Sequence, residues 1–572
     1  MMLNRGTLNG DEFTIDFADG AIKFRNEEGA FYSKIFHIID IDTDGLIGGG
    51  EGACFIRRAK LSNEDNREIW RLASGGKSLE KLNKDCWFVA MKLVSMVQHT
   101  GRCDIQILYD GDTYPLADFQ LEGPPDSTLP GDQDDTFVDA ERFRVTVSTP
   151  VVAGSGYSRY TQYIISTKVD LSYFPVSFAQ VKRRYSDFEW LQQRLLIRFR
   201  GTIIPPLPEK KWAGSMDATF VEERRQALEY FINEVCHHGK LSKTLELQII
   251  LTASGEGLAA GKELLRVNSL VKNMLPNSAS IVSMWSTLKD GAAFSSSVQQ
   301  VEIPADDEYA KIGEYIEIYE KRISQVKICS DNIYAAQRAE GYEMSRFGSY
   351  LSELSSFLKN NPTMQALFQV GPPHLRVLIL LMRPLQAGGD LFENVSNLYQ
   401  DQLDKILAMY VSVVRYQMGK ISAVKVVMSN RETAIKEVQK ANISMQRNKE
   451  RFAAARASSG AAASAMRAEQ KMTSAEDQLN HAKEQVHFIA TSLKHESRKL
   501  DNGKAMNLKR ALLSLAHLEK DYHAQAQTAW ASLIPLLDAS PEIQAESQKR
   551  VSTPVSYRKP GEKAASQLIG LL

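Results

Sequence analysis

Apolar residues repeat with different periods along the chain, and each change of period marks a change of predicted structure. Between residues 25 and 100 the repeat is helical and forms two helix–loop–helix units. After an Asp-, Pro- and Gly-rich stretch, alternating residues such as Phe143, Val145 and Val147 predict strands, and two further helical patterns follow them. From residue 306 to 538 a spacing near 3.5 continues through three long helices, which is typical of coiled-coil-like packing.

The long helices exceed what a compact bundle needs. The second and third each run for about 50 residues or more, which corresponds to roughly 75 Å at the rise of an α-helix. Their apolar stripes are too long to be covered within one chain, so the pattern predicts an elongated homodimer. The stripe of the first long helix consists of Ile312, Ile316, Tyr319, Ile323, Val326 and Ile333.

Composition narrows the class of protein. The 572 residues are too many for one core and predict several domains, while 43% hydrophobic and 24% charged residues are ordinary for a soluble protein. There is no apolar run of about 18 residues and no Lys/Arg-led start, so we expect neither a transmembrane helix nor a secretory signal. The five scattered cysteines form no CxxC pair and predict reduced thiols in the cytoplasm.

An acidic loop near the N-terminus fits the calcium-loop pattern D-x-D-x-D-G-x5-E. Carboxylates at the first, third, fifth and twelfth positions supply oxygen ligands, and a glycine at the sixth permits the sharp turn. The ligands are Asp40, Asp42, Asp44 and Glu51. We therefore predict one Ca²⁺ here, with a structural loop that no longer binds metal as the alternative. The second loop, Ser74–Glu80, starts without an acid and cannot form such a cage.

Three basic motifs follow one another in the β-rich region. Arg184 and Tyr185 lie in RRYSDF, Lys210 closes PPLPEK, and Arg224 opens RRxALEYF. Adjacent arginines bind phosphate with planar paired donors, and three basic sites in this order indicate an anion site rather than solvated surface. The loop after Lys210 carries apolar residues that we expect to insert into a membrane interface, unless the loop packs on its own domain. These residues are Trp212, Met216 and Phe220.

Positive charge is concentrated locally, although 69 Lys and Arg balance 69 Asp and Glu over the chain. Between Arg415 and Lys471 there are 12 basic residues against 4 acidic ones, around an Ala/Ser/Gly-rich turn between two helices. Each such cation near an anionic bilayer contributes about 1 kcal/mol, whereas the alternative is a solvated helix. The predicted membrane contacts are Lys436, Lys440, Arg447, Lys449 and Arg451. No aromatic residues interleave with them, so nucleic acid is not an expected partner.

The three basic motifs resemble the phox-homology (PX) domain of sorting nexins over residues 140–252. The resemblance implies that Arg184 holds the 3-phosphate of phosphatidylinositol 3-phosphate and that Tyr185 packs on its inositol ring. It also implies that Lys210 meets the 1-phosphate and Arg224 the 4- and 5-hydroxyls. A PX domain followed by three long helices resembles the PX-BAR sorting nexins, whose BAR domains dimerise into crescents.

The N-terminal paired loops, together with the segment around Trp70, resemble the Eps15-homology (EH) domain, a pair of EF-hands. That resemblance implies a pocket for Asn-Pro-Phe peptides at Leu61 and Trp70. Two polar residues, Asp65 and Asn66, replace the aliphatic residues usual before the tryptophan. The alternative reading makes Trp70 a core residue.

Together these features predict an EF-hand-pair (EH-like) domain, an α+β PX domain and an all-α BAR domain. The expected function is a non-enzymatic peripheral protein of early endosomes that binds phosphatidylinositol 3-phosphate and senses or generates curvature in cargo sorting and retrograde trafficking. The alternative is a calcium-responsive adaptor that recruits Asn-Pro-Phe partners. The sequence contains no HExxH, GxSxG or GxxxxGK[ST] motif and no Rossmann fingerprint. The expected segments are 1–24, the EH-like domain 25–105, a linker 106–139, the PX domain 140–252, a linker with an amphipathic helix 253–302, the BAR domain 303–545 and a tail 546–572.

Overall fold

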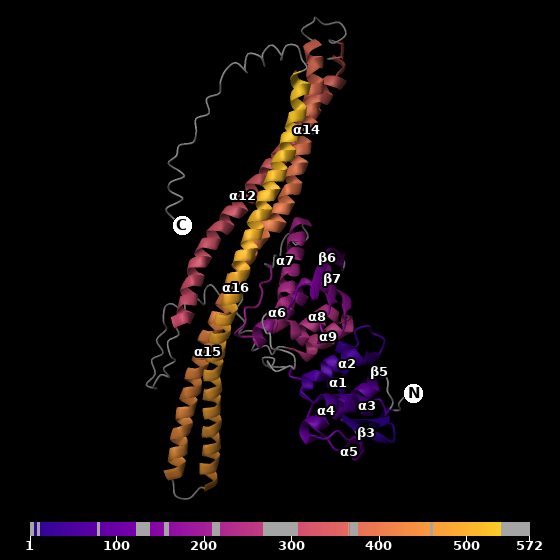
Figure 1. Cartoon of the computed structure of the whole chain (residues 1–572), viewed down its shortest axis with the longest axis vertical. Coiled ribbons are helices and arrows are strands. Elements are labelled where there is room, and N and C mark those ends of the chain that lie inside the picture. The colour runs from indigo at the N-terminus through magenta and orange to yellow at the C-terminus, as the bar shows by residue number, and fades with distance from the viewer. Residues whose placement is uncertain are drawn as a thin grey trace. The chain divides into compact units, whose positions relative to one another are not determined.

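The structure is a computed structural model of the whole chain (Figure 1). It describes residues 5–8, 12–76, 80–121, 138–153, 160–208, 218–266, 307–363, 365–366, 376–457 and 462–538. The chain divides into two compact units. The first unit comprises Met1–Ser324 and Val414–Ala505, and the second comprises Gln325–Val413 and Met506–Leu572.

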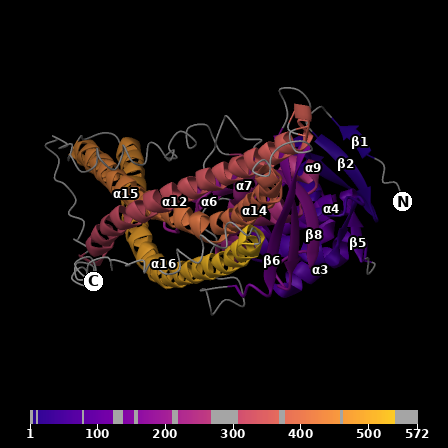
Figure 2. The same cartoon turned by 90° about the horizontal axis from the view of Figure 1, so that it is seen from above.

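The first unit begins with an antiparallel three-stranded sheet, whose strands β1 and β2 lie side by side in Figure 2. Its strands are β1 (Arg5–Leu8), β2 (Glu12–Phe17) and β3 (Gly20–Arg25). Ile15, Phe17, Ile22 and Phe24 point alternate side chains into the core, and all four are buried. No strand was predicted for residues 1–24, although this alternation is visible in the sequence.

Two helix–loop–helix units follow the sheet. Their loops pair through a short antiparallel ribbon in which Ile47 lies opposite Leu82, and both residues are fully buried. The elements are α1 (Asn26–Ile39), β4 (Leu46–Gly48), α2 (Gly49–Ile56), α3 (Asn63–Ala73), β5 (Lys81–Asn83) and α4 (Lys84–Thr100). Side-chain caps start two of the helices, since Ser62 accepts from the Asp65 amide and Asn83 from the Cys86 amide.

Parts of the two predicted linkers, 106–139 and 253–302, belong to this N-terminal domain. After α5 (Ile105–Tyr109), Ala117 and Phe119 are buried in its core, so the domain continues past residue 106. Helix α9 (Gly255–Leu264) also packs here, against α1, and Leu265 is buried in the same core. The rest of the predicted amphipathic helix in the 253–302 linker, beyond Arg266, lies outside the described residues.

An α+β domain occupies residues 138 to 253. Its sheet has the antiparallel order β6-β7-β8, and α6 and α7 bury Phe188, Leu191, Leu195 and Phe231 against it. The elements are β6 (Phe143–Ala153), β7 (Tyr160–Val169), β8 (Phe178–Arg184), α6 (Tyr185–Arg198), α7 (Ala218–His237) and α8 (Leu245–Thr252).

Three long helical runs make up most of the described residues from Asp307 onward, as the sequence predicts. They are α12 (Asp307–Asn360), the run of α14 (Arg376–Ile406), a π-helical turn (Leu407–Val411) and α15 (Ser412–Ala457), and finally α16 (Ala462–Asp538). In the second unit Tyr334, Tyr399, Leu403 and Tyr522 share one buried cluster. Within the described ranges, no helix is both long enough and apolar enough to cross a membrane.

Candidate functional site

The arginine doublet at the end of β8 has one buried and one exposed member. Successive residues of a strand point to opposite faces. Arg183 is 3% exposed, and its guanidinium donates to the backbone carbonyls of Ile250, Ile249 and Ala253 at 2.8, 3.1 and 2.6 Å. These carbonyls end α8, so the cation completes the hydrogen bonds of a helix C-terminus. Burial lowers the pKa of Arg183 to about 10, which leaves it charged at neutral pH. Arg183 is therefore a structural residue.

Arg184 points the other way, into solvent. Its side chain is 58% exposed, and its guanidinium lies 6.0 Å from the centre of the Tyr160 ring. Its backbone amide donates to the Asp187 carboxylate at 2.8 Å, which fixes the backbone where β8 turns into α6. The side chain thus stands at the positive end of a helix with its donors accessible, as an anion-binding residue requires.

Tyr185 and Arg224 meet beside this arginine. The Tyr185 hydroxyl donates to the Pro208 carbonyl at 2.7 Å, and the Arg224 guanidinium lies 4.8 Å from the centre of the Tyr185 ring. Burial raises the pKa of Tyr185 to about 12, so the phenol stays protonated and keeps its role as a donor. Arg224 is 8% exposed, which makes it part of the floor of the site rather than its rim.

The structure therefore brings Arg184, Tyr185 and Arg224 to one corner of the α+β domain. Lys210, Trp212 and Met216 lie outside the described residues, as does the side chain of Phe220 at the start of α7. Tyr160 was not predicted as a site residue, because nothing in the local sequence indicates that the first residue of β7 lies close to the Arg184 guanidinium.

Helix α7 also attaches this corner to α15 within the first unit. Glu223, next to Arg224, pairs with Arg415 at 3.0 Å, and Glu234 pairs with Lys420 at 2.6 Å. Between these ion pairs, the rings of Tyr230 and Tyr416 lie 5.6 Å apart. The helix that carries Arg224 is thus held against a long helix by both charge and aromatic packing.

The predicted membrane cations of α15 are all exposed, which leaves their charges accessible. They are Lys436, Lys440, Arg447, Lys449 and Arg451. Helix α15 ends at Ala457 and α16 begins at Ala462, in the small-residue stretch where the sequence predicts the turn.

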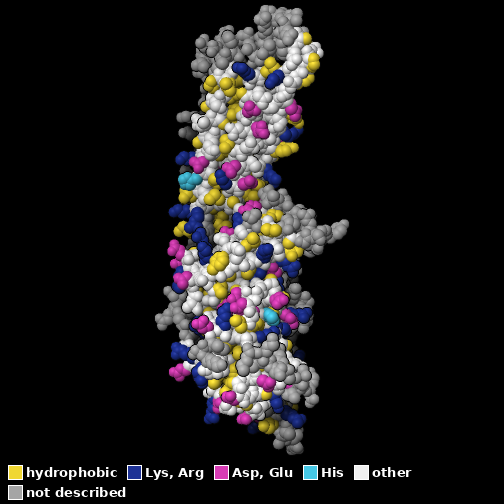
Figure 3. Space-filling model, turned by 90° about the vertical axis from the view of Figure 1, so that its right-hand side faces the viewer, with side chains coloured by type: hydrophobic (Ala, Val, Ile, Leu, Met, Phe, Trp, Pro, Cys, Tyr) yellow, Lys and Arg dark blue, Asp and Glu magenta, His cyan; other side chains and the backbone are white. Residues whose placement is uncertain are grey.

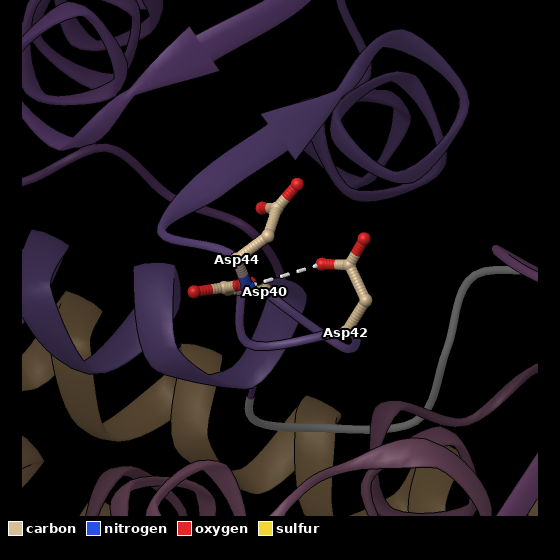
Figure 4. A group of neighbouring side chains, drawn as sticks. All are labelled: Asp40, Asp42 and Asp44. Carbon is tan, nitrogen blue, oxygen red and sulfur yellow. Dashed lines mark hydrogen bonds between the residues drawn. The ribbon is translucent and has the colours of Figure 1, made fainter.

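The acidic loop of the N-terminal domain gathers three of its four predicted ligands. Asp40, Asp42 and Asp44 each place an oxygen within 4.8 Å of the others (Figure 4). Gly45, with φ of +78°, makes the turn, and its amide donates to Asp40 Oδ2 at 3.1 Å. Asp40 is 7% exposed, its Oδ1 has no hydrogen-bond partner, and desolvation raises the pKa of its carboxyl. A buried oxygen without a partner fits a site for a cation.

Two features limit that fit. Glu51 does not join the cluster, because its Oε2 accepts from the Gly48 amide at 3.0 Å and caps α2 instead. Lys81 on β5 extends its ammonium to 2.5 Å from Asp44 and 3.5 Å from Asp42, and this hydrogen bond lowers the pKa of Asp44. A Ca²⁺ ion would have to draw Glu51 from the cap and displace the Lys81 ammonium.

This geometry makes calcium binding testable. We expect Ca²⁺ to raise the melting temperature of the full chain's first transition by several degrees relative to chelator, because a ligand at about 100 times its Kd adds about 2.7 kcal/mol. Asp40→Ala with Glu51→Ala should remove that difference, whereas Lys81→Met should enlarge it. Differential scanning fluorimetry measures the effect. Identical wild-type melts in calcium and in chelator would mark the loop as a structural turn.

Trp70 and Leu61 are both half-buried against the N-terminal core. A Cβ atom placed on Gly52 would lie 2.5 Å from the Trp70 ring, so the indole packs directly on the start of α2. The core reading of Trp70 is consistent with this packing, and the Asn-Pro-Phe pocket stays a prediction.

Comparison with known proteins identifies two regions. Residues 172–254 match the family model "PX domain", and residues 381–535 match "Vps5 C terminal like". The first match contains Arg184, Tyr185 and Arg224, and the second covers most of α14, α15 and α16. The chain therefore combines a PX domain with a Vps5-like, BAR-type helical domain.

Individual relatives agree with that class. Human sorting nexin-3 is 39% identical over 121 residues, 19% of this chain and 74% of that protein. Sorting nexin 1 of Arabidopsis thaliana is 28% identical over 247 residues, 42% of this chain, and the match spans only 59% of its own length. Sorting nexin-30 of Xenopus tropicalis is 23% identical over 421 residues, 73% of this chain and 80% of that protein. The chain belongs to the sorting nexin family.

Proposed function

We propose that this sorting nexin is a cytoplasmic, peripheral protein of early endosomes, where it binds phosphatidylinositol 3-phosphate and acts as a curvature-sensing or curvature-generating BAR homodimer. Its role would be endosomal cargo sorting and retrograde trafficking, and that role needs no catalytic residue. The observation that carries the proposal is the divided arginine doublet. Arg183 is buried and donates its hydrogen bonds to backbone carbonyls, whereas Arg184 is held at a helix N-terminus with an accessible guanidinium.

In this proposal each residue of the corner has one task. Arg184 donates to the 3-phosphate, the Tyr185 ring packs on the inositol, and the Arg224 guanidinium meets the 4- and 5-hydroxyls. Lys210 meets the 1-phosphate, and Trp212, Met216 and Phe220 enter the interface, where aromatic side chains are favoured. The half-buried position of Tyr185 and the fixed position of Arg224 support a preformed site. Vesicle flotation, with the variants given below, is the test.

Dimerisation is supported by apolar side chains that the second unit leaves in solvent. On α12, Val326, Ile333, Phe347 and Leu354 follow one another at multiples of seven positions and are 42–59% exposed. Large apolar side chains that are exposed along one face of a helix indicate a surface that another chain covers. Helix α16 adds exposed apolar residues in the same unit, namely Met506, Leu512, Leu513, Ile534 and Leu536. A second copy of the chain is the occupant we propose.

Membrane attraction must come from local charge. On the face drawn in Figure 3, basic and acidic side chains are interspersed, which agrees with the balance of 69 against 69 over the whole chain. A single headgroup contact and a weak basic surface give useful avidity only when both subunits engage them on one membrane. This coincidence would restrict stable binding to curved membranes that contain the lipid.

Reversing the five exposed cations of α15 is expected to abolish tubulation while leaving the dimer intact. The change is Lys436, Lys440, Arg447, Lys449 and Arg451 to Glu. It turns about 1 kcal/mol of attraction per site into repulsion, and none of the five residues belongs to the exposed apolar stripe of α12. Electron microscopy of anionic vesicles and light scattering measure the two effects. High salt should imitate the variant in part, because exposed charges are screened beyond about 8–10 Å. Persistent tubules would contradict the assignment.

A further inference from the structure

A lysine from outside the three basic motifs lies close to the proposed phosphoinositide site of Arg184, Tyr185 and Arg224. Lys262 lies on α9, and its ammonium is 2.5 Å from Asp187 Oδ1 and 5.8 Å from the centre of the Trp190 ring. Asp187 is 4% exposed. Its Oδ2 accepts the Arg184 backbone amide at 2.8 Å, and its Oδ1 also lies 3.8 Å from Arg184 Nε. One buried carboxylate thus lies beside two cations, Lys262 and the proposed lipid ligand Arg184, and it also interacts electrostatically with the buried Arg183.

The two cations stand in different relations to that carboxylate. Lys262 is in hydrogen-bond contact with it, whereas the Arg184 guanidinium is too distant for a hydrogen bond and remains 58% exposed. A buried carboxylate that loses its partner is costly and recruits the nearest cation. Without Lys262, that cation is Arg184, because the Arg183 guanidinium is held by three backbone carbonyls. Its guanidinium would then turn from solvent toward Asp187 and lose donors for a lipid phosphate.

The N-terminal domain fixes the place of Lys262. Within α9, Glu263 pairs with Lys34 of α1 at 2.8 Å. A Cβ atom on Gly257 would collide with the carbonyl of His37 near the end of α1, so the two helices are in contact at that point. Leu265, just after α9, is buried in the N-terminal core. The position of Lys262 beside the proposed phosphoinositide site therefore depends on α9, a helix that the N-terminal domain holds in place.

We propose that Lys262 is a positioning residue of the phosphoinositide site: by neutralising Asp187 it keeps the Arg184 guanidinium available for phosphate. The N-terminal domain thereby contributes to lipid binding through α9, without touching lipid. This inference rests on the proposed function of Arg184. It assigns to the N-terminal domain a role that does not require calcium or a peptide.

The test is flotation of the full chain with vesicles of phosphatidylcholine containing phosphatidylinositol 3-phosphate. Lys262→Met keeps an unbranched side chain but removes the charge, and we expect roughly fivefold to tenfold weaker binding. Lys262→Arg should retain binding. Lys168→Met, which removes an exposed charge from β7 of the same domain, is the matched control and should bind as wild type. Gly257→Val, which displaces α9, should weaken binding as Lys262→Met does.

The decisive variant combines Lys262→Met with Asp187→Asn. Asparagine can still accept the Arg184 backbone amide but no longer attracts its guanidinium, so binding should return close to wild type. If Lys262→Met binds as wild type, or if Asp187→Asn fails to restore binding, the positioning role is refuted. If wild type and Arg184→Ala float equally, the proposed function itself fails. That result can be distinguished from the two outcomes that refute only the positioning role of Lys262.

Discussion

Replacing Arg184 by Ala is expected to weaken binding to vesicles containing phosphatidylinositol 3-phosphate by roughly a hundredfold, with the melting temperature unchanged. The loss corresponds to about 2.7 kcal/mol, the size of one or two charge-assisted hydrogen bonds. Stability should not change, because the side chain is 58% exposed and its guanidinium forms no hydrogen bond within the part of the chain that the structure describes. The Asp187 carboxylate keeps its hydrogen bond from Lys262 in the variant. Flotation and thermal melting of the same preparations measure both quantities.

Arg183, the neighbouring arginine, provides a control in which stability, rather than lipid binding alone, should be lost. Arg183→Ala removes the donors to three carbonyls at the end of α8 and leaves a buried gap, so it should lower stability by several kcal/mol. Arg144→Ala, at an exposed position of β6, should change neither binding nor stability. If Arg184→Ala floats like wild type, or if Arg144→Ala is equally impaired, Arg184 is not the phosphate ligand.

Placing aspartate in the exposed stripe of α12 is expected to convert the dimer to monomer. Ile333→Asp with Leu354→Asp puts four charges into a twofold interface and removes four apolar contacts, which should raise the dimer dissociation constant at least about a thousandfold. Sedimentation equilibrium of the full chain measures that constant. The monomer should keep its helices by circular dichroism, because both side chains are 47% or more exposed in the single chain.

The matched control changes the same helix outside the stripe. Ala335→Asp with Ser356→Asp alters exposed positions between the heptad repeats and should leave the dimer intact. A wild-type chain that sediments as a monomer would contradict the BAR assignment directly. If the variant with Ile333→Asp and Leu354→Asp is still a dimer, the exposed stripe of α12 is not the dimer interface.

The sequence predicted the order of elements well because each signal was local. Alternation identifies the strands of the α+β domain, and spacing near 3.5 identifies α12, α15 and α16. The same alternation could have shown which arginine of the doublet is buried. Arg183 lies four residues after the buried Ala179, on the same face of β8, whereas Arg184 lies on the opposite face. That Arg183 binds carbonyls near residue 250 could not be predicted, because the contact depends on how α8 packs against the sheet.

Periodicity also leaves open which surface covers an apolar stripe. Val326 and Ile333 follow the same pattern as Ile316 and Ile323, yet the first pair is exposed and the second is buried. The spacing of acidic residues in a loop likewise predicts which side chains could bind a metal ion but not their rotamers. Glu51 was therefore expected among the Ca²⁺ ligands, whereas its carboxylate caps the N-terminus of α2. Lys262 carries no motif, and only the fold brings α9 to Asp187.

Lipid selectivity of the wild-type full chain is the most direct test of the central claim. Equilibrium binding to immobilised vesicles should be compared for phosphatidylinositol 3-phosphate, phosphatidylinositol 4-phosphate and phosphatidylinositol, in one phosphatidylcholine background and at physiological salt. We expect at least tenfold tighter binding to phosphatidylinositol 3-phosphate than to either other lipid, and loss of that preference in Arg184→Ala. Equal binding to all three lipids would contradict the assignment of Arg184 as the ligand of the 3-phosphate.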